Sequence, residues 1–311
     1  MVDTRACPLN GSMQRPFLLL AVLGLLVPAN SGAQQTGVVS AAPITLAGSQ
    51  SLFERVADNQ KKNEREMDLY ERIERLEIRK SGADPLPSST KITRVIPAGT
   101  GSGRISLGPD GKPPDPAAYR AELERVIHSL AWAAEDGRAQ RDAYERVAKK
   151  HREREQLINA TRTAFIYTFV GREPRGDRML TKYRIEPNPD FHPANRMEAI
   201  FTKVRGFVWV DEQSCQLARV EGDVTEDISI GLFLGRIYKG SHFMQDRYEI
   251  SPGVWLPTFS QYDFDGRKFL SAFSIHERTF YTNYRRIGPP KAALPIIRAE
   301  LDNQAAAQAD P

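Results

Sequence analysis

The chain has 311 residues, with 43 Lys and Arg against 39 Asp and Glu. This near balance argues against a nucleic-acid partner, because nucleic-acid-binding domains carry a clear excess of positive charge. Hydrophobic residues make up 41% of the chain, which is enough for the core of one large domain or two small ones.

The first 33 residues are typical of a secretory signal peptide. Arg5 and Arg15 precede a uniformly apolar run over residues 17–27, and small residues follow up to Ala33. The run is shorter than the roughly 20 residues that a membrane-spanning helix needs, so we expect no permanent membrane span. We predict cleavage between Ala33 and Gln34, and therefore a periplasmic or secreted protein.

Cysteine usage limits how the mature chain is stabilised. Cleavage removes Cys7 and leaves Cys215 alone, so no disulfide can form within the mature chain and a packed core must stabilise it. Cys7 lies before the apolar run rather than directly after it, so we expect no lipid attachment. Residues 34–48 lack charge and are rich in small residues, which predicts a flexible linker.

The segment after the linker mixes helical and strand patterns. Residues 49–63 place apolar side chains at helical spacing, which predicts a short amphipathic helix. Residues 67–78 fit neither period cleanly, so a continued helix competes with a strand from about residue 68, which we favour. Residues 91–96 and 104–107 are short β-branched runs around a glycine-rich loop and predict two strands.

A proline-rich boundary at residues 108–116 separates these strands from a helical insertion at 117–160. Asp115 before Pro116 is a favourable start for a helix, and the apolar positions that follow recur at steps of three and four. The insertion forms two helices or one helix broken near Gly137. Acidic and basic residues interleave over residues 149–155, which is typical of a solvated helix face.

From residue 163 to residue 287 the chain is rich in strand-forming residues. The predicted strands cover 163–171, 179–186, 206–211, 216–221, 232–239, 241–250, 254–264 and 268–284. Their connections are too short for parallel crossovers, so an antiparallel meander is expected. We predict one domain over residues 49–287, followed by a loosely ordered tail at 288–311.

Several of these strands are apolar on both faces. Phe165 and Tyr167 alternate with Ile166, and Phe207 alternates with Val208. An antiparallel sheet usually has one face in water, so a doubly apolar sheet needs a cover of helices, a second sheet or a ligand. The fold class is therefore α+β, with helices available from the insertion.

The strand-and-turn pattern resembles a known family of exported proteins. The segments that carry the resemblance are 203–211, 216–222, 239–241, 253–257 and 266–269. They are similar to the half-barrel proteins of the periplasmic outer-membrane lipoprotein-carrier superfamily (LolA- and LolB-like), over roughly residues 163–286 with a weaker echo in 50–107. The resemblance implies a curved antiparallel sheet, closed by helices over an apolar cavity.

The same resemblance implies a non-enzymatic binding module that holds a lipid, a lipoprotein acyl chain or another apolar ligand. The residues predicted to line its cavity are Phe165, Tyr167, Phe207, Trp209, Leu232, Leu234, Trp255, Phe259, Phe269 and Phe273. Each of them could instead fill a closed core. The alternative function is an interaction or structural module of the cell envelope that engages a protein partner and holds no ligand.

The sequence contains no strong catalytic or metal-binding pattern. Its five histidines are scattered, and His276 and Glu277 would point to opposite faces of a strand. Cys215 lies in a turn without a nearby histidine. Residues 263–266 read Asp-Phe-Asp-Gly, which predicts a hairpin turn rather than a calcium loop. We therefore expect no enzyme activity, metal or cofactor.

Overall fold

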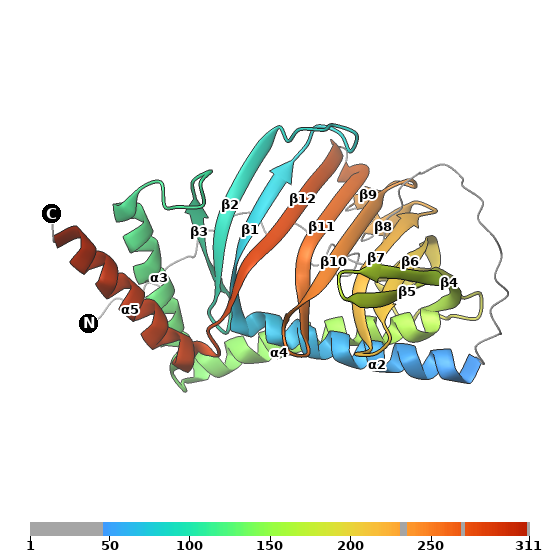
Figure 1. Ribbon diagram of the computed structural model, residues 1–311, viewed down its shortest axis with the longest axis horizontal. Helices are drawn as coiled ribbons and strands as arrows, with labels where there is room; N and C mark the ends of the chain where they lie inside the picture. Colours follow the sequence, from blue (N-terminus) through green and yellow to red (C-terminus); the bar gives the residue numbers. More distant parts are fainter. Residues whose placement is uncertain (1–45, 231–234, 269–270, 310–311) are drawn as a thin grey trace.

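The structure, a computed structural model, describes residues 46–230, 235–268 and 271–309. Within these residues twelve strands form one antiparallel sheet that is partly covered by helices (Figure 1). The sheet is curved and remains open, with β3 at one edge and β4 at the other. The predicted α+β half-barrel is confirmed. The signal peptide, its cleavage site and residues 34–45 lie outside the described residues.

The strands follow the order β3-β2-β1-β12-β11-β10-β7-β6-β5-β4 across the sheet, and β9 joins β8 to β11. Their bounds are β1 Tyr70–Ile78, β2 Ser89–Pro97, β3 Ser102–Leu107, β4 Phe165–Arg175, β5 Arg178–Pro187, β6 Val204–Asp211, β7 Gln216–Val224, β8 Ile228–Ile230, β9 Gly235–Ile237, β10 His242–Ser251, β11 Val254–Lys268 and β12 Ser271–Arg286. The predicted meander is confirmed over β4 to β12, with the β8–β9 pair as a side branch. The first three strands continue the sheet because β1 pairs with β12.

The helices are α2 Leu46–Glu66, α3 Pro116–Ala134, α4 Arg138–Ala164 and α5 Pro290–Ala309, with 3-10 turns η1 Met67–Leu69 and η2 Glu198–Lys203. The insertion forms two helices, because the chain breaks at Gly137, the N-cap of α4. Asp115 caps α3 by accepting a hydrogen bond from the amide of Ala117 at 2.9 Å.

The carboxy-terminal segment differs from the prediction. Residues 290–309 form α5 rather than a loosely ordered tail, because its Ala293 and Ile297 are buried against α3 and the sheet. The large apolar residues of this helix cover only a short stretch of it, and the Pro- and Ala-rich composition of the segment did not indicate a packed helix. None of the helices in the described part of the chain is both long and apolar enough to span a membrane.

Cross-strand pairing shows that the two pairs of helices cover opposite faces of the sheet. Gln245 of β10 lies on the face of the sheet that α2 covers. The residues paired with it in turn on β11, β12 and β1 lie on the same face, and this row ends at Lys91 of β2. Side chains alternate between the two faces along a strand, and Ile96 is an odd number of residues from Lys91, so it points to the other face. There it packs with Leu123 of α3 and Ile297 of α5.

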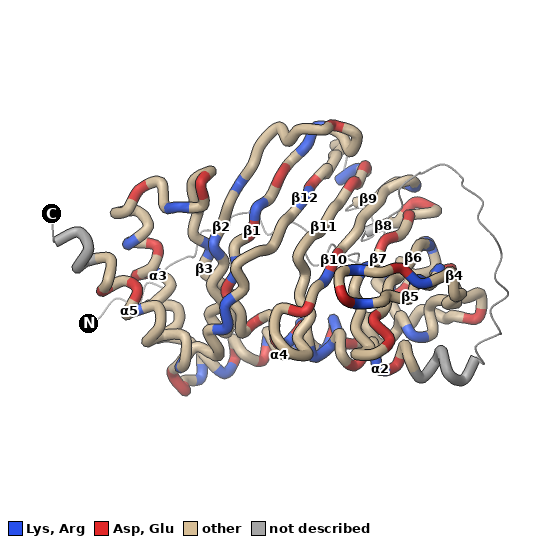
Figure 2. The backbone as a smooth tube through the Cα atoms, in the orientation of Figure 1, with Lys and Arg blue, Asp and Glu red and all other residues tan. Residues whose placement is uncertain are grey.

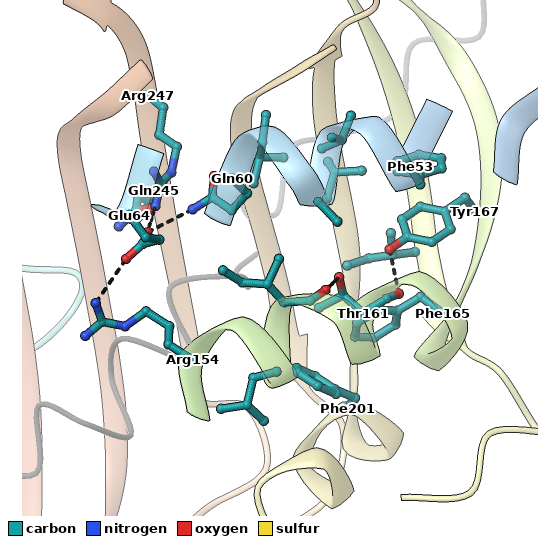
Figure 3. A pocket seen from close by; sticks show the side chains of 17 residues that line it. Phe53, Gln60, Glu64, Arg154, Thr161, Phe165, Tyr167, Phe201, Gln245 and Arg247 are labelled. Carbon is teal, nitrogen blue, oxygen red and sulfur yellow. Dashed lines mark hydrogen bonds and ion pairs between the residues drawn. The ribbon is translucent and has the colours of Figure 1, made fainter. Parts of the chain in front are cut away.

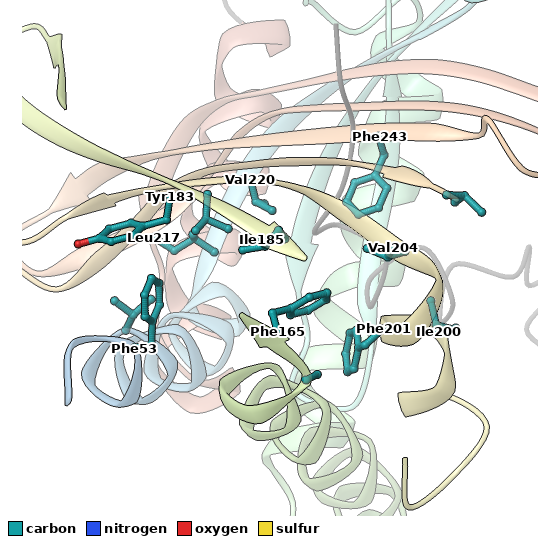
Figure 4. Close-up of a cluster of buried hydrophobic side chains, with 14 of the residues drawn as sticks. Phe53, Phe165, Tyr183, Ile185, Ile200, Phe201, Val204, Leu217, Val220 and Phe243 are labelled. Atoms are coloured by element: carbon teal, nitrogen blue, oxygen red, sulfur yellow. The ribbon is translucent and has the colours of Figure 1, made fainter. Parts of the chain in front are cut away.

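The larger core lies between the sheet and the pair α2 and α4, which run side by side (Figures 1 and 4). Phe53 of α2 stacks on Tyr167 of β4 with ring centroids 3.6 Å apart, and Phe165 meets Phe201 of η2 edge to face. Basic and acidic positions interleave along both helices (Figure 2). The helices thus bury one apolar stripe each and leave mixed charge in solvent.

Candidate functional site

A cavity of about 80 Å³ lies between the sheet and the helices α2 and α4 (Figure 3). Its apolar wall is formed by Phe53, Val56, Ala57, Leu157, Ile158, Phe165, Tyr167, Ile185, Phe201, Val208 and Leu217. Its polar lining comprises Gln60, Glu64, Arg154, Thr161, Gln245 and Arg247. A partly open, mostly apolar space with a few polar groups has the composition of a site for a small ligand.

Helix α2 supplies one wall of this cavity through a single stripe of side chains. Phe53, Val56, Ala57, Gln60 and Glu64 recur at steps of three and four, so they share one face of the helix. The first three are apolar and the last two are polar. The cavity therefore has an apolar end near the start of α2 and a polar end near its carboxyl terminus.

The polar end is organised around the carboxylate of Glu64. Arg247 Nη2 donates to Glu64 Oε1 at 3.0 Å, and Arg154 Nη1 lies 3.3 Å from Oε2. Arg247 is 5% exposed, and its Nε donates to Gln245 Oε1 at 2.9 Å. Because two guanidinium groups meet one carboxylate, this end of the cavity has a net positive charge.

Gln60 joins the same cluster but leaves one of its polar atoms unused. Its Nε2 donates to Glu64 Oε1 at 2.9 Å. Its Oε1 is buried, and no donor in the described part of the chain hydrogen-bonds to it. A buried acceptor without a partner is costly, and such atoms in native structures are few.

Tyr167 completes the apolar end as a neutral side chain. Burial raises the pKa of its phenol, although the hydroxyl donates to the carbonyl of Thr161 at 2.8 Å. The ring stacks on Phe53, as described above. Tyr167 therefore contributes aromatic surface to the cavity and no titratable charge near neutral pH.

A second hollow, of about 170 Å³, lies along α4 beside the loop before η2. It is lined by Lys150, Glu153, Arg154, Gln156, Leu157, Asn195 and Met197. Arg154 and Leu157 border both spaces. These two side chains of α4 thus form part of the wall between the apolar cavity and the second hollow.

Helix α2 is held over the cavity by its buried apolar stripe, which includes Phe53 and Val56, and by polar contacts. Asn63, 1% exposed, donates to Gln216 Oε1 at 2.8 Å and accepts from the amide of Trp255 at 3.1 Å. Towards α4, Arg162 pairs with Glu54 at 2.7 Å. These polar contacts add to the apolar packing and fix α2 against the sheet and α4.

Of the predicted lining residues, the structure brings Phe165 and Tyr167 to the cavity. Phe207 and Trp209 flank Val208 along β6, and because Val208 lines the cavity they point to the opposite face. There they pack with Trp255 in a separate cluster. Both faces of this strand are apolar, so its sequence could not show which face meets the cavity.

The remaining predicted residues lie elsewhere. Phe259 packs against Phe280, with ring centroids 5.0 Å apart, and Phe273 packs at the margin of the larger core. Leu232, Leu234 and Phe269 lie outside the described residues. The prediction missed the polar residues at the cavity, of which Gln60 and Glu64 continue the apolar stripe of α2 and could have been found from it.

Residues 263–266 lie within β11, so the predicted hairpin turn there is wrong. Asp263 is tolerated inside the strand because its carboxylate contacts His242 at 3.0 Å, His276 at 3.0 Å and Arg278 at 2.9 Å. Burial raises its pKa, but the hydrogen bonds from His242 and Arg278 outweigh this and hold it well below its usual range. Among the residues that the structure describes, no group of three or more His, Cys, Asp or Glu side chains could hold a metal ion.

The fold and the cavity define an open half-barrel with a helix-covered apolar site. No protein-family model and no curated protein sequence matches the chain. Among solved structures, it is similar to a Vibrio parahaemolyticus domain described as that of an outer membrane lipoprotein-sorting protein, with 8% identity, a TM-score of 0.27, and coverage of 75% of this chain and 92% of that one. This is a distant resemblance to the family named from the sequence, so the function is drawn from the cavity alone.

Proposed function

We propose that the protein is a non-enzymatic binding module that holds the acyl chain of a lipid or lipoprotein between its sheet and α2. The observation that carries this proposal is the apolar cavity with a positively charged polar end. An acyl chain matches the apolar wall, and a polar head group matches the end at Glu64, Arg154 and Arg247. The signal-peptide pattern before Ala33 supports action in the periplasm or outside the cell.

The volume of the cavity limits how much of an acyl chain can enter without a movement of the protein. A cavity of about 150 Å³ holds one benzene molecule, so about 80 Å³ holds only a short stretch of an acyl chain. A longer chain requires α2 to move away from the sheet. Each buried methylene contributes roughly 0.8 kcal/mol, so about ten methylenes contribute roughly 8 kcal/mol towards replacing the apolar and polar contacts that α2 loses.

The test is a titration of the purified chain 34–311 with a fluorescent long-chain fatty acid. Val208 is 5% exposed and lines the cavity, so Val208→Phe places an aromatic ring in the space that the acyl chain needs. Val170→Phe makes the same change at a half-exposed position of β4 that does not line the cavity. We expect Val208→Phe to weaken binding at least tenfold and Val170→Phe to leave it unchanged.

Thermal melting of both variants shows whether they fold, because overpacking costs about 1–3 kcal/mol. Equal binding by wild type and folded Val208→Phe would place the ligand elsewhere. Absence of binding to the wild-type chain, together with native mass spectra that show no co-purified acyl species, would overturn the proposal.

A further inference from the structure

We propose that the ligand carries a hydrogen-bond donor, an amide N–H or a hydroxyl, where its acyl chain meets its head group, and that Gln60 Oε1 accepts this hydrogen bond. The inference rests on the proposed function and names the class of ligand that the cavity selects. It starts from the one feature of the cavity that the protein's own contacts leave incomplete, the buried and unpartnered Oε1 of Gln60.

The orientation of the Gln60 amide follows from its neighbours. The carboxylate of Glu64 is bound to Arg154 and Arg247, so it acts only as an acceptor. Turning the Gln60 amide over would bring its oxygen against Glu64 Oε1, which now receives Nε2 at 2.9 Å. Glu64 thus directs the Nε2 of Gln60 to itself and leaves Oε1 for another donor.

The position of Gln60 on α2 places this acceptor where chain and head group would meet. Val56 and Ala57, one turn earlier, belong to the apolar wall, and Glu64, one turn later, belongs to the charged end. A donor attached directly to the acyl chain would therefore meet Oε1, which is buried in this structure, when α2 moves to admit the chain. An ester at the same place offers only acceptors and would leave Gln60 unpaired.

The charges at the polar end narrow the class of head group further. Arg154 and Arg247 outnumber Glu64, so an ammonium group, although it is a donor, would meet net positive charge. A neutral or anionic head group is favoured instead. The ligand class is thus an amide-linked acyl chain or a hydroxylated acyl chain, and not an alkylamine or a simple acyl ester.

Matched amphiphiles test this inference directly. N-dodecanoylglycine and dodecanoyloxyacetic acid differ only by N–H against O at the linking atom, and 3-hydroxydodecanoic acid and dodecanoic acid differ only by one hydroxyl. Isothermal titration of wild-type chain 34–311 should show five- to tenfold tighter binding of the donor-bearing member of at least one pair, the range of one net hydrogen bond. The pair that shows the preference distinguishes an amide from a hydroxyl.

Gln60→Met keeps the length of the side chain and removes the acceptor, and Gln213→Met makes the same change at an exposed turn. Gln60→Met should abolish the preference by weakening only the donor-bearing ligand, whereas Gln213→Met should preserve it. Equal binding within both pairs by the wild type, or a preference that persists in Gln60→Met, would overturn this inference and leave the proposed function standing. If the wild type binds none of the four amphiphiles, both proposals fail.

Discussion

The two ends of the half-barrel are covered by helices in opposite ways. At the cavity end, α2 and α4 lie over the sheet, border a space of about 80 Å³ and leave Gln60 Oε1 unpartnered. At the compact end, α3 and α5 lie on the other face, and Leu123 and Ile297 are completely buried. The difference is that one helix pair completely fills its side of the sheet, while the other leaves an unfilled space.

A buried arginine illustrates the contrast. Arg94 of β2 donates to Glu71 at 2.6 Å and to Glu300 of α5 at 2.9 Å, and it also reaches the hydroxyl of Tyr119 on α3. Burial lowers the pKa of Arg94, but the hydrogen bond with Glu300 and the charge of Glu71 outweigh this and raise it. The ion cluster of the compact end is thus completed within the protein, unlike the cluster around Gln60.

The largest effect is expected from removing that arginine. Arg94→Met removes the buried cation that Glu71 and Glu300 share and leaves them the half-exposed Arg285. Breaking a buried ion pair in this way costs about 3–5 kcal/mol. Urea unfolding measures the loss. Arg104→Met is the control, because Arg104 is half exposed and its pair with Glu74 contributes at most about 1 kcal/mol. Equal losses in the two variants would show that the compact end does not depend on its ion cluster.

The next largest effect is expected from shortening an apolar side chain, which should cost more stability at the compact end than at the cavity end. Ile297→Ala creates a void in a filled core and should cost about 2–4 kcal/mol. Leu157→Ala at the cavity wall should cost roughly 1 kcal/mol, because Leu157 is only partly buried and already borders two empty spaces. It should also tighten fatty-acid binding by joining those spaces. A greater loss of stability in Leu157→Ala than in Ile297→Ala would contradict the comparison.

The mobility of α2 is open to a similar test. Asn63→Ala leaves Gln216 Oε1 and the Trp255 amide without their partner and should cost about 1–3 kcal/mol. Hydrogen exchange should become faster in α2 and stay unchanged in α3 and α5. Uniformly faster exchange over the whole chain would mean that α2 does not open as a separate unit.

The smallest effect concerns acid pH. Burial raises the pKa of Glu300, but the hydrogen bond and charge of Arg94 outweigh this and lower it. Its contribution to stability is therefore complete above the unfolded pKa, about 4.3, and is lost as the pH falls through the folded value. Glu300→Gln should cost about 1 kcal/mol at pH 7 and less at pH 3, measured by thermal melting. A cost that stays constant between the two pH values would exclude this linkage.

Much of the fold was predictable because local patterns and tertiary packing agree. The runs of strand-forming residues in β4 to β7 and the cap at Asp115 act within a few residues, and the structure has strands and a helix start there. The turn predicted at residues 263–266 was wrong because Asp-Gly favours a turn locally, whereas contacts of Asp263 with His276 and Arg278 on the neighbouring strand keep β11 extended. Tertiary ion pairs outweighed local turn propensity at this point.

The sequence by itself determined the fold class, the antiparallel order of most strands and the need for a helical cover, because short connections and apolar periodicity constrain these features locally. Only the tertiary structure decided which face of β6 meets the cavity, that α5 is a packed helix, and that Gln60, Glu64, Arg154 and Arg247 converge. Those residues come from two helices and a strand far apart in the chain. Their proximity depends on how the helices dock on the curved sheet, and no local pattern encodes that docking.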